Sequence, residues 1–230
     1  MSLLNLYEYK GTYSGLDKLA LTKLLQILDN INIKDNINIL EFGSGQSTKF
    51  LVDYKLKTNK NIFIDSYDHD INYCYKNNNN YNFLNIYIKP LIQCNDYNYN
   101  KQLEEIKFNR ENYSIAPILP YNHPKFWRQR NCIYDINTDE LKNIYDIIIV
   151  DGPNGNGRNL SYLFFKDRVK PGTFILIDDF NSCDDSFNYN FIENLKKIIN
   201  VKEIYRSESK SNNAKDTWEN GGNFMIFKVI

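Results

Sequence analysis

The sequence lacks an excess of charge of either sign. Its 230 residues carry 28 Lys and Arg against 28 Asp and Glu, so the formal net charge is zero. A protein that binds nucleic acid mainly through its phosphates usually has a basic excess. The charge balance therefore argues against a nucleic-acid-binding protein, although a local basic patch is compatible with it.

Long apolar runs and paired metal-binding residues are also missing. No stretch approaches the length of a membrane span, and residues 1–15 show no cationic start followed by an apolar run, so we expect neither a membrane protein nor a signal peptide. The two histidines and four cysteines show no C-x-x-C or Cys–His ligand spacing, which argues against a zinc site. Dispersed cysteines indicate free thiols in a reducing compartment, and we expect a cytoplasmic protein.

What the chain does have is a regular alternation of apolar segments. With 42% hydrophobic residues it can form one domain with a full core, which we assign to residues 1–230. The order predicts an α/β fold, a doubly wound, mostly parallel, seven-stranded sheet of Rossmann-like type. The last two strands have no helix between them, which predicts an antiparallel strand at one edge. The predicted strands are 36–42, 61–68, 83–89, 144–153, 173–180, 201–209 and 222–230.

Residues 90–144 show no clear periodicity, and we interpret them as an insertion that shapes a substrate pocket. The insertion contains HPKFWRQR (123–130), in which Phe126 and Trp127 lie among Lys125, Arg128 and Arg130. Aromatic rings among cations can stack on a sugar or base and hold an anion. The more common explanation is that the rings anchor the insertion to the core while the cations stay in water.

The segment LEFGSGQST (40–48) follows the first predicted strand and leads into a helix. Gly43 and Gly45 leave room for a ligand against the backbone. A dinucleotide requires a third glycine, but Thr48 stands there, and Glu41 would repel a pyrophosphate. S-adenosylmethionine has no phosphate and carries an ammonium and a sulfonium, so the loop favours it. A second acid, Asp68, ends the next strand, where it can bind ribose hydroxyls.

Four motifs together resemble the class I S-adenosylmethionine-dependent methyltransferases. They are LEFGSGQST (40–48), SYDHD (66–70), YDIIIVDGP (145–153) and KPGTFILIDDF (170–180), and they are most similar to a group of small O-methyltransferase-like proteins. The acid at Asp68 departs from the glutamate that is more common there. The cofactor site that we predict comprises Glu41, Gly43, Ser44, Gly45, Gln46, Ser47, Asp68 and His69.

Three further acids, Asp151, Asp178 and Asp179, end the fourth and fifth predicted strands. Carboxylates that converge on one cleft repel each other unless a cation, a proton or a basic residue intervenes. The set is similar to the Mg²⁺ site of catechol-type O-methyltransferases, although Asp179 replaces an asparagine and Asn154 replaces their catalytic lysine. The other possibility is Arg158, whose guanidinium can pair with these acids from the loop 152–158. The acids can also simply cap turns.

These patterns predict an S-adenosylmethionine-dependent methyltransferase that acts on a hydroxyl of a small molecule or sugar. Asp151 is the expected general base or metal ligand, with Arg158 as a second catalytic residue. Alternatives that stay open are a nucleic-acid-modifying methyltransferase, a catalytically silent cofactor-binding subunit, and aminopropyl transfer from the decarboxylated cofactor. The methyl acceptor, a metal requirement and the oligomeric state are not determined by these patterns.

Overall fold

The structure is a computed structural model of the chain. It describes residues 15–31, 36–72, 74–76, 80–117, 119, 129–180, 190–207 and 222–230. Most of the HPKFWRQR segment, including Lys125, Phe126, Trp127 and Arg128, lies outside these ranges. Within them, no helix combines the length and the apolar character needed to cross a membrane.

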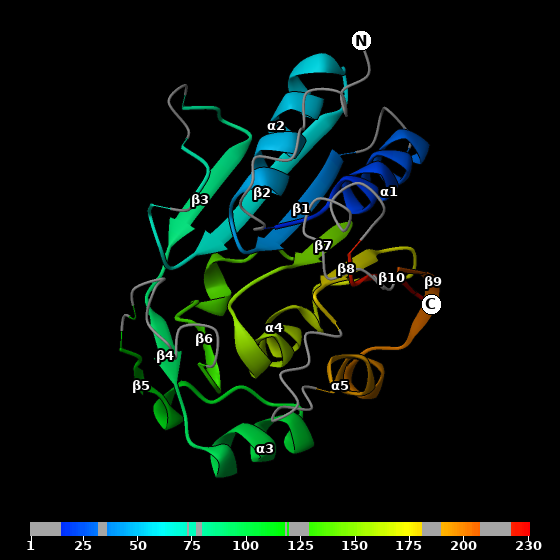
Figure 1. The fold of residues 1–230 in the computed structure, drawn as a ribbon. Helices are drawn as coiled ribbons and strands as arrows, with labels where there is room; N and C mark the ends of the chain where they lie inside the picture. Colours follow the sequence, from blue (N-terminus) through cyan, green and yellow to red (C-terminus); the bar gives the residue numbers. More distant parts are fainter. Residues whose placement is uncertain are drawn as a thin grey trace.

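A seven-stranded sheet forms the centre of the molecule (Figure 1), as the alternation of apolar segments predicts. Its strand order is β3-β2-β1-β7-β8-β10-β9, and every neighbouring pair is parallel except those made by β10. The antiparallel strand β10 lies between β8 and β9, one position in from the edge. The strands are β1 (Asn36–Phe42), β2 (Asn61–Asp68), β3 (Leu84–Ile88), β7 (Ile147–Val150), β8 (Phe174–Asp178), β9 (Val201–Ser207) and β10 (Phe224–Val229).

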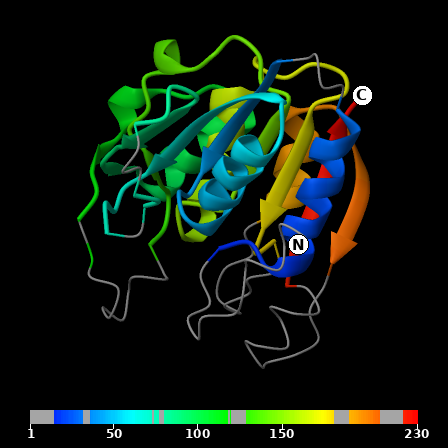
Figure 2. The ribbon, with the colours of Figure 1, turned by 90° about the horizontal axis from the view of Figure 1, so that it is seen from above.

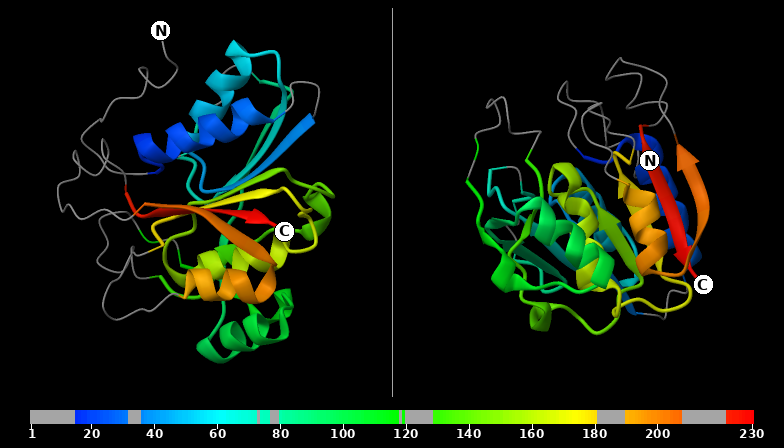
Figure 3. Two further views of the ribbon diagram at one scale, coloured as in Figure 1. Left: turned by 90° about the vertical axis from the view of Figure 1, so that its right-hand side faces the viewer. Right: turned by 90° about the horizontal axis from the view of Figure 1, so that it is seen from below.

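Helices cover both faces of this sheet (Figure 3), which explains why the central strands are apolar without alternation. Every residue of β7 is buried. One face carries α1 (Lys18–Asn30) and α2 (Gln46–Lys57), which Figure 2 shows from above. The other face carries α4 (Arg158–Phe165) and α5 (Phe191–Ile198).

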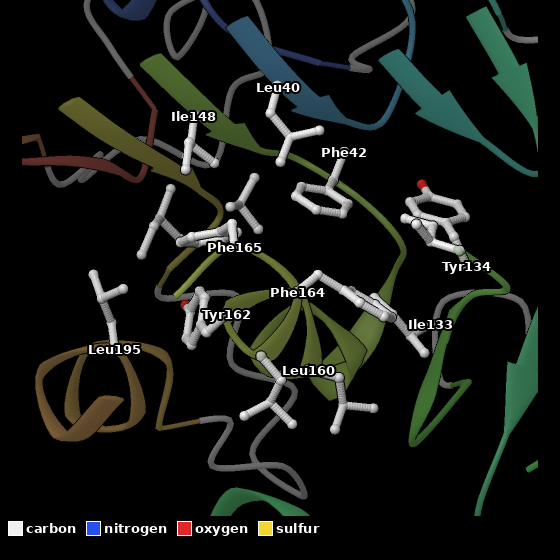
Figure 4. Close-up of a cluster of buried hydrophobic side chains, with 14 of the residues drawn as sticks. Leu40, Phe42, Ile133, Tyr134, Ile148, Leu160, Tyr162, Phe164, Phe165 and Leu195 are labelled. Carbon is white, nitrogen blue, oxygen red and sulfur yellow. The ribbon is translucent and has the colours of Figure 1, made fainter. Parts of the chain in front are cut away.

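Each face has its own hydrophobic core. The first core joins α1 and α2 to the sheet. The second core joins α4 and α5 to the other face and continues into the 90–144 segment. Figure 4 shows part of this second core, where Phe42 and Ile148 of the sheet face Phe165 of α4 and Tyr134 of the insertion. The insertion is therefore packed onto the main domain.

The segment 90–144 folds into short elements of its own. Its strands form a three-stranded antiparallel sheet in the order β5-β4-β6. Strands of two or three residues are too short to show a period, which is why the sequence pattern gave no clear reading here. The elements are β4 (Leu91–Gln93), α3 (Asp96–Glu105), η2 (Arg110–Asn112), β5 (Ser114–Ile115), β6 (Cys132–Tyr134) and η4 (Thr138–Glu140).

The strand order reverses direction at β1. From β1 the chain builds β2 and β3 on one side, and it later returns to place β7 on the other side of β1. In open α/β sheets a ligand binds in the crevice at the carboxyl ends of the strands, at this switch point. The carboxyl ends of β1 and β7 carry the glycine loop and Asp151, so both predicted functional segments lie at the switch point.

Candidate functional site

The glycine loop joins β1 to α2 and packs directly on the end of β7. Gly43 has a φ of +100°, and a Cβ added to it would lie 3.0 Å from the backbone nitrogen of Gly152. A Cβ on Gly152 would in turn collide with the hydroxyl of Tyr134. Gly45 is different, because a Cβ there would have no atom of the described residues within 4 Å. Gly43 therefore permits close packing, whereas Gly45 leaves one side of the loop open.

Glu41 lies beneath this loop and is completely buried. Its Oε2 accepts hydrogen bonds from the hydroxyls of Thr48 and Ser66, the latter at 2.6 Å. Burial raises the pKa of the Glu41 carboxyl, and the hydroxyls of Ser47, Ser66 and Thr48 oppose the rise. Its Oε1 is buried too and has no hydrogen-bond partner among the described residues. Glu41 thus holds the loop and keeps one acceptor unsatisfied.

Thr48 explains why the dinucleotide pattern is broken at this position. Its hydroxyl donates to Glu41 and accepts a hydrogen bond from the backbone N–H of Gly45 at 2.9 Å. A glycine at this position would leave the carboxylate of Glu41 and the N–H of Gly45 without this partner. At the third position of the motif, Thr48 therefore stabilises the buried carboxylate of Glu41.

Asp68 lies at the end of β2 on the other side of the loop, and it is also buried. One of its carboxylate oxygens accepts from the backbone N–H of Ser44 at 2.9 Å, and the other from those of His69 and Asp70 at 2.6 and 2.9 Å. Both oxygens are thus engaged by the protein itself. Contact with a ribose requires Asp68 to exchange at least one of these hydrogen bonds.

The remaining predicted cofactor residues divide by exposure. Ser44 and Ser47 are buried, whereas Gly43, Gly45, Gln46 and His69 are half-buried. His69 lies with its Nδ1 3.3 Å from a carboxylate oxygen of Asp68. The accessible part of the loop is therefore backbone at the two glycines, flanked by Gln46 and His69, and the two predicted acids lie behind it.

Asp151, Asp178 and Asp179 converge as the sequence predicts. One carboxylate oxygen from each lies within 4.8 Å of the others. The side chain of Asp151 is 13% exposed and that of Asp179 is 43% exposed, so the cluster opens to solvent on the Asp179 side. Asp179 has a φ of +51°, a left-handed conformation that costs energy in a residue other than glycine.

Arg158 is buried against the acid cluster and is held in place. Its Nη2 lies 3.3 Å from a carboxylate oxygen of Asp179 and 3.7 Å from one of Asp151. Its Nη1 donates to the backbone carbonyl of Asp178 at 2.7 Å, and its Nε donates to that of Pro153. The structure thus brings Arg158 to the predicted acids, at the start of α4, in a fixed position.

The pKa values of Asp151 and Asp178 are raised even though Arg158 lies beside them. Burial raises the pKa of Asp151 to about 7, and Arg158 opposes the rise while Asp179 and Glu41 add to it. Burial, together with Asp179 and Asp151, raises the pKa of Asp178 well above its ordinary value. Three carboxylates against one guanidinium leave excess negative charge in a desolvated site. Three oxygen donors close together also fit a hard divalent cation such as Mg²⁺.

Sequence reasoning did not identify Tyr134 and Asp17 as parts of this region. Tyr134 comes from the insertion, stacks on Phe42 with ring centroids 6.4 Å apart, and closes on Gly152. Asp17 is buried at the start of α1, and its carboxylate accepts from the backbone N–H of Ala20 and Gly222. Tyr134 had no detectable signal because its strand is three residues long. The bond from Ala20 is the local N-cap bond that aspartate favours, whereas the bond from Gly222 joins residues 205 positions apart and has no local signal.

Comparisons with known proteins give only distant likenesses. No protein-family model matches the chain, and no curated protein matches it. A solved structure described as cmcI-N160 SAH is 12% identical to this chain and has a TM-score of 0.41. The match covers 96% of this chain and 81% of that structure's chain. A candidate methyltransferase from Thermoplasma acidophilum is 13% identical, covers 86% and 70%, and has a TM-score of 0.32. At this sequence identity and TM-score, neither likeness supports an argument about this chain.

Proposed function

We propose that the chain is an S-adenosylmethionine-dependent methyltransferase of the class I type, which methylates a hydroxyl of a small molecule or sugar. The observation that supports this is the meeting of two segments at the switch point of the sheet. The open glycine loop after β1 touches the end of β7 at Gly152, directly beside the acid Asp151. A cofactor on the loop and an acceptor at the acid are then neighbours.

The charges around the loop favour a cationic cofactor. Glu41 and Asp68 are both buried next to the loop, and the Glu41 carboxyl is close enough to Asp151 to raise the pKa of Asp151. A negative field of this kind opposes a pyrophosphate and stabilises an ammonium or sulfonium. The unsatisfied Oε1 of Glu41 can accept a hydrogen bond from an ammonium or from a water bound to it. S-adenosylmethionine, when bound, supplies an electrophilic methyl group.

Asp151 suits the role of general base in methyl transfer to a hydroxyl. A base is most effective when its pKa lies near the working pH, and burial places that of Asp151 at about 7. Its carboxylate accepts the proton of the acceptor hydroxyl as the oxygen forms its new bond. Arg158 offsets the negative charge at Asp151 and Asp179. A divalent cation held by Asp151, Asp178 and Asp179 would also offset this negative charge, and it would lower the pKa of a hydroxyl bound to it.

Calorimetric titration with S-adenosylhomocysteine tests the cofactor assignment. We expect saturable binding by the wild type and none of NADH under the same conditions. Gly45→Val should abolish the binding, because the added side chain fills the open side of the loop where no described atom lies within 4 Å. Asn143→Ala, an exposed change before β7, is the control and should bind normally.

Two results would refute the proposal. The first is a folded wild type that binds no S-adenosylhomocysteine at millimolar concentration. The second is a Gly45→Val variant that binds as tightly as the wild type. A protein that binds S-adenosylhomocysteine but transfers no methyl group to any hydroxyl acceptor would instead identify a silent cofactor-binding subunit.

A further inference from the structure

A cavity of about 410 Å³ lies away from the glycine loop, between α3, α5 and the segment that precedes α4. Figure 1 shows these helices on the same side of the large sheet. The volume is within the range of about 300–1,000 Å³ that is usual for small-molecule sites. The insertion contributes Asp96, Tyr99, Asn100, Leu103, Glu104 and Arg130 to its walls.

The floor of the cavity is rigid. Tyr99 is buried, and its hydroxyl donates to the backbone carbonyl of Asn156 at 3.1 Å. Asn156 is buried as well and exchanges two hydrogen bonds with Asn131: its Oδ1 accepts from the backbone N–H at 2.6 Å, and its Nδ2 donates to the side-chain oxygen at 2.8 Å. Leu103 adds an apolar surface. Tyr99 and Leu103 are only 8% and 6% exposed, so a ligand would touch the edges of these two side chains on a floor that hydrogen bonds hold in place.

The upper walls carry polar side chains that are not engaged. Within the described part of the chain, the carboxamides of Asn100, Asn190 and Asn194 make no hydrogen bond. Each carboxamide offers both donors and an acceptor. A hydroxyl group likewise donates and accepts, so three uncommitted carboxamides around one cavity match a ligand with several hydroxyls.

The formal charges on the walls cancel. Asp96 and Glu104 carry negative charge, and Arg130 and Lys197 carry positive charge. A phosphorylated or polyanionic ligand would find no positive excess here, and a strongly apolar ligand would cover too many polar groups. The chemistry of the walls therefore selects a neutral polar molecule.

We propose that this cavity binds a neutral, hydroxyl-rich ligand of the saccharide class, whose hydroxyls form hydrogen bonds with Asn100, Asn190 and Asn194. The cavity and the acid cluster share one segment of chain, since Asn156 lines the cavity and Arg158 contacts Asp151 and Asp179. The ligand site is separate from the acceptor position at Asp151, since neither Asp151 nor Arg158 lines the cavity.

Saturation-transfer difference NMR on the full chain tests the site. The probes are the methyl glycosides of glucose, galactose, mannose, xylose, rhamnose and N-acetylglucosamine, each at millimolar concentration. We expect saturation transfer from the protein to at least one of these glycosides. Asn100→Ala and Asn194→Ala should each lower the affinity for that glycoside about fivefold, as for the loss of one hydrogen bond. Asn143→Ala is the matched control, because Asn143 is exposed and does not line the cavity.

The assignment is overturned if the wild type shows no transfer to any glycoside, or if the double variant Asn100→Ala/Asn194→Ala binds as the wild type does. A melting curve on each variant shows that it is folded. Titration of the same samples with S-adenosylhomocysteine separates the two proposals. Glycoside binding without cofactor binding supports this cavity and refutes methyl transfer, whereas cofactor binding without glycoside binding refutes this cavity alone.

Discussion

Adding Mg²⁺ to the purified protein tests the acid cluster directly, because the cation should raise the melting temperature at pH 8. Asp151, Asp178 and Asp179 present three oxygens within 4.8 Å of one another. A ligand that binds only the folded state stabilises it by about 2.7 kcal/mol when its concentration is about 100 times Kd. A domain of this size gains about 2–4 °C per kcal/mol, so we expect a rise of about 5–10 °C.

The pH dependence of this rise follows from the pKa of Asp151, which burial raises from 3.8 to about 7. Near pH 6 the carboxyl is mostly protonated, and a proton must leave before the cation binds. The affinity then falls about tenfold relative to pH 8, which removes about 1.4 kcal/mol, or about half, of the stabilisation. The increment in melting temperature should therefore be about half as large near pH 6.

Without the cation the dependence has the opposite sign. The folded state of Asp151 holds its proton to a higher pH than the unfolded state does, since burial raises its pKa from 3.8 to about 7. The stability that this gives is complete below about pH 4 and is lost as the pH rises through about 7. Asp178 acts in the same direction. The melting temperature of the cation-free protein should thus fall between pH 4 and pH 8.

Scanning calorimetry with and without the cation measures both effects. Asp151→Asn should lose the increment caused by Mg²⁺. Asp167→Asn, which changes an acid whose side chain is 81% exposed outside the cluster, should keep it. An identical response of wild type and Asp151→Asn to Mg²⁺ would refute cation binding at these acids. Arg158 would then be the cation that serves them.

Three other predictions concern the loop and the framework. Thr48→Val removes a hydroxyl donor from the buried Glu41 and should weaken S-adenosylhomocysteine binding about tenfold by calorimetry, as for a lost hydrogen bond to a charged group; unchanged affinity would contradict our account of the loop. Gly152→Ala should lower the melting temperature by collision with Tyr134, and the double variant with Tyr134→Phe should recover part of the loss; no recovery would contradict this cause. Lys60 donates to three backbone carbonyls at the end of α1, so Lys60→Met should cost about 2–3 kcal/mol in urea unfolding without changing cofactor affinity.

Much of the fold could be predicted from the sequence because it follows from local periods. The strands at 36–42 and 61–68 coincide with β1 and β2, since isoleucines recur at every second position in each (Ile37 and Ile39, Ile62 and Ile64), the period of a strand. The predicted α2 helix likewise begins where the glycines end. The position of β10 between β8 and β9 was harder to predict from the sequence, because strand order depends on which strand edges pair across long stretches of chain.

The sequence by itself determined which residues gather at the switch point: the glycine loop, Asp68, Asp151, and the acids Asp178 and Asp179 at the end of β8. Strand ends in a parallel sheet meet at one edge, so their order along the chain is enough to bring them together. Only the tertiary structure decided which way they face. Glu41 is held by Ser66, which is 25 residues away in the chain, and Gly43 packs on Gly152 from another strand. Burial, hydrogen-bond partners and pKa values arise from such distant contacts, and no local pattern of residues contains them.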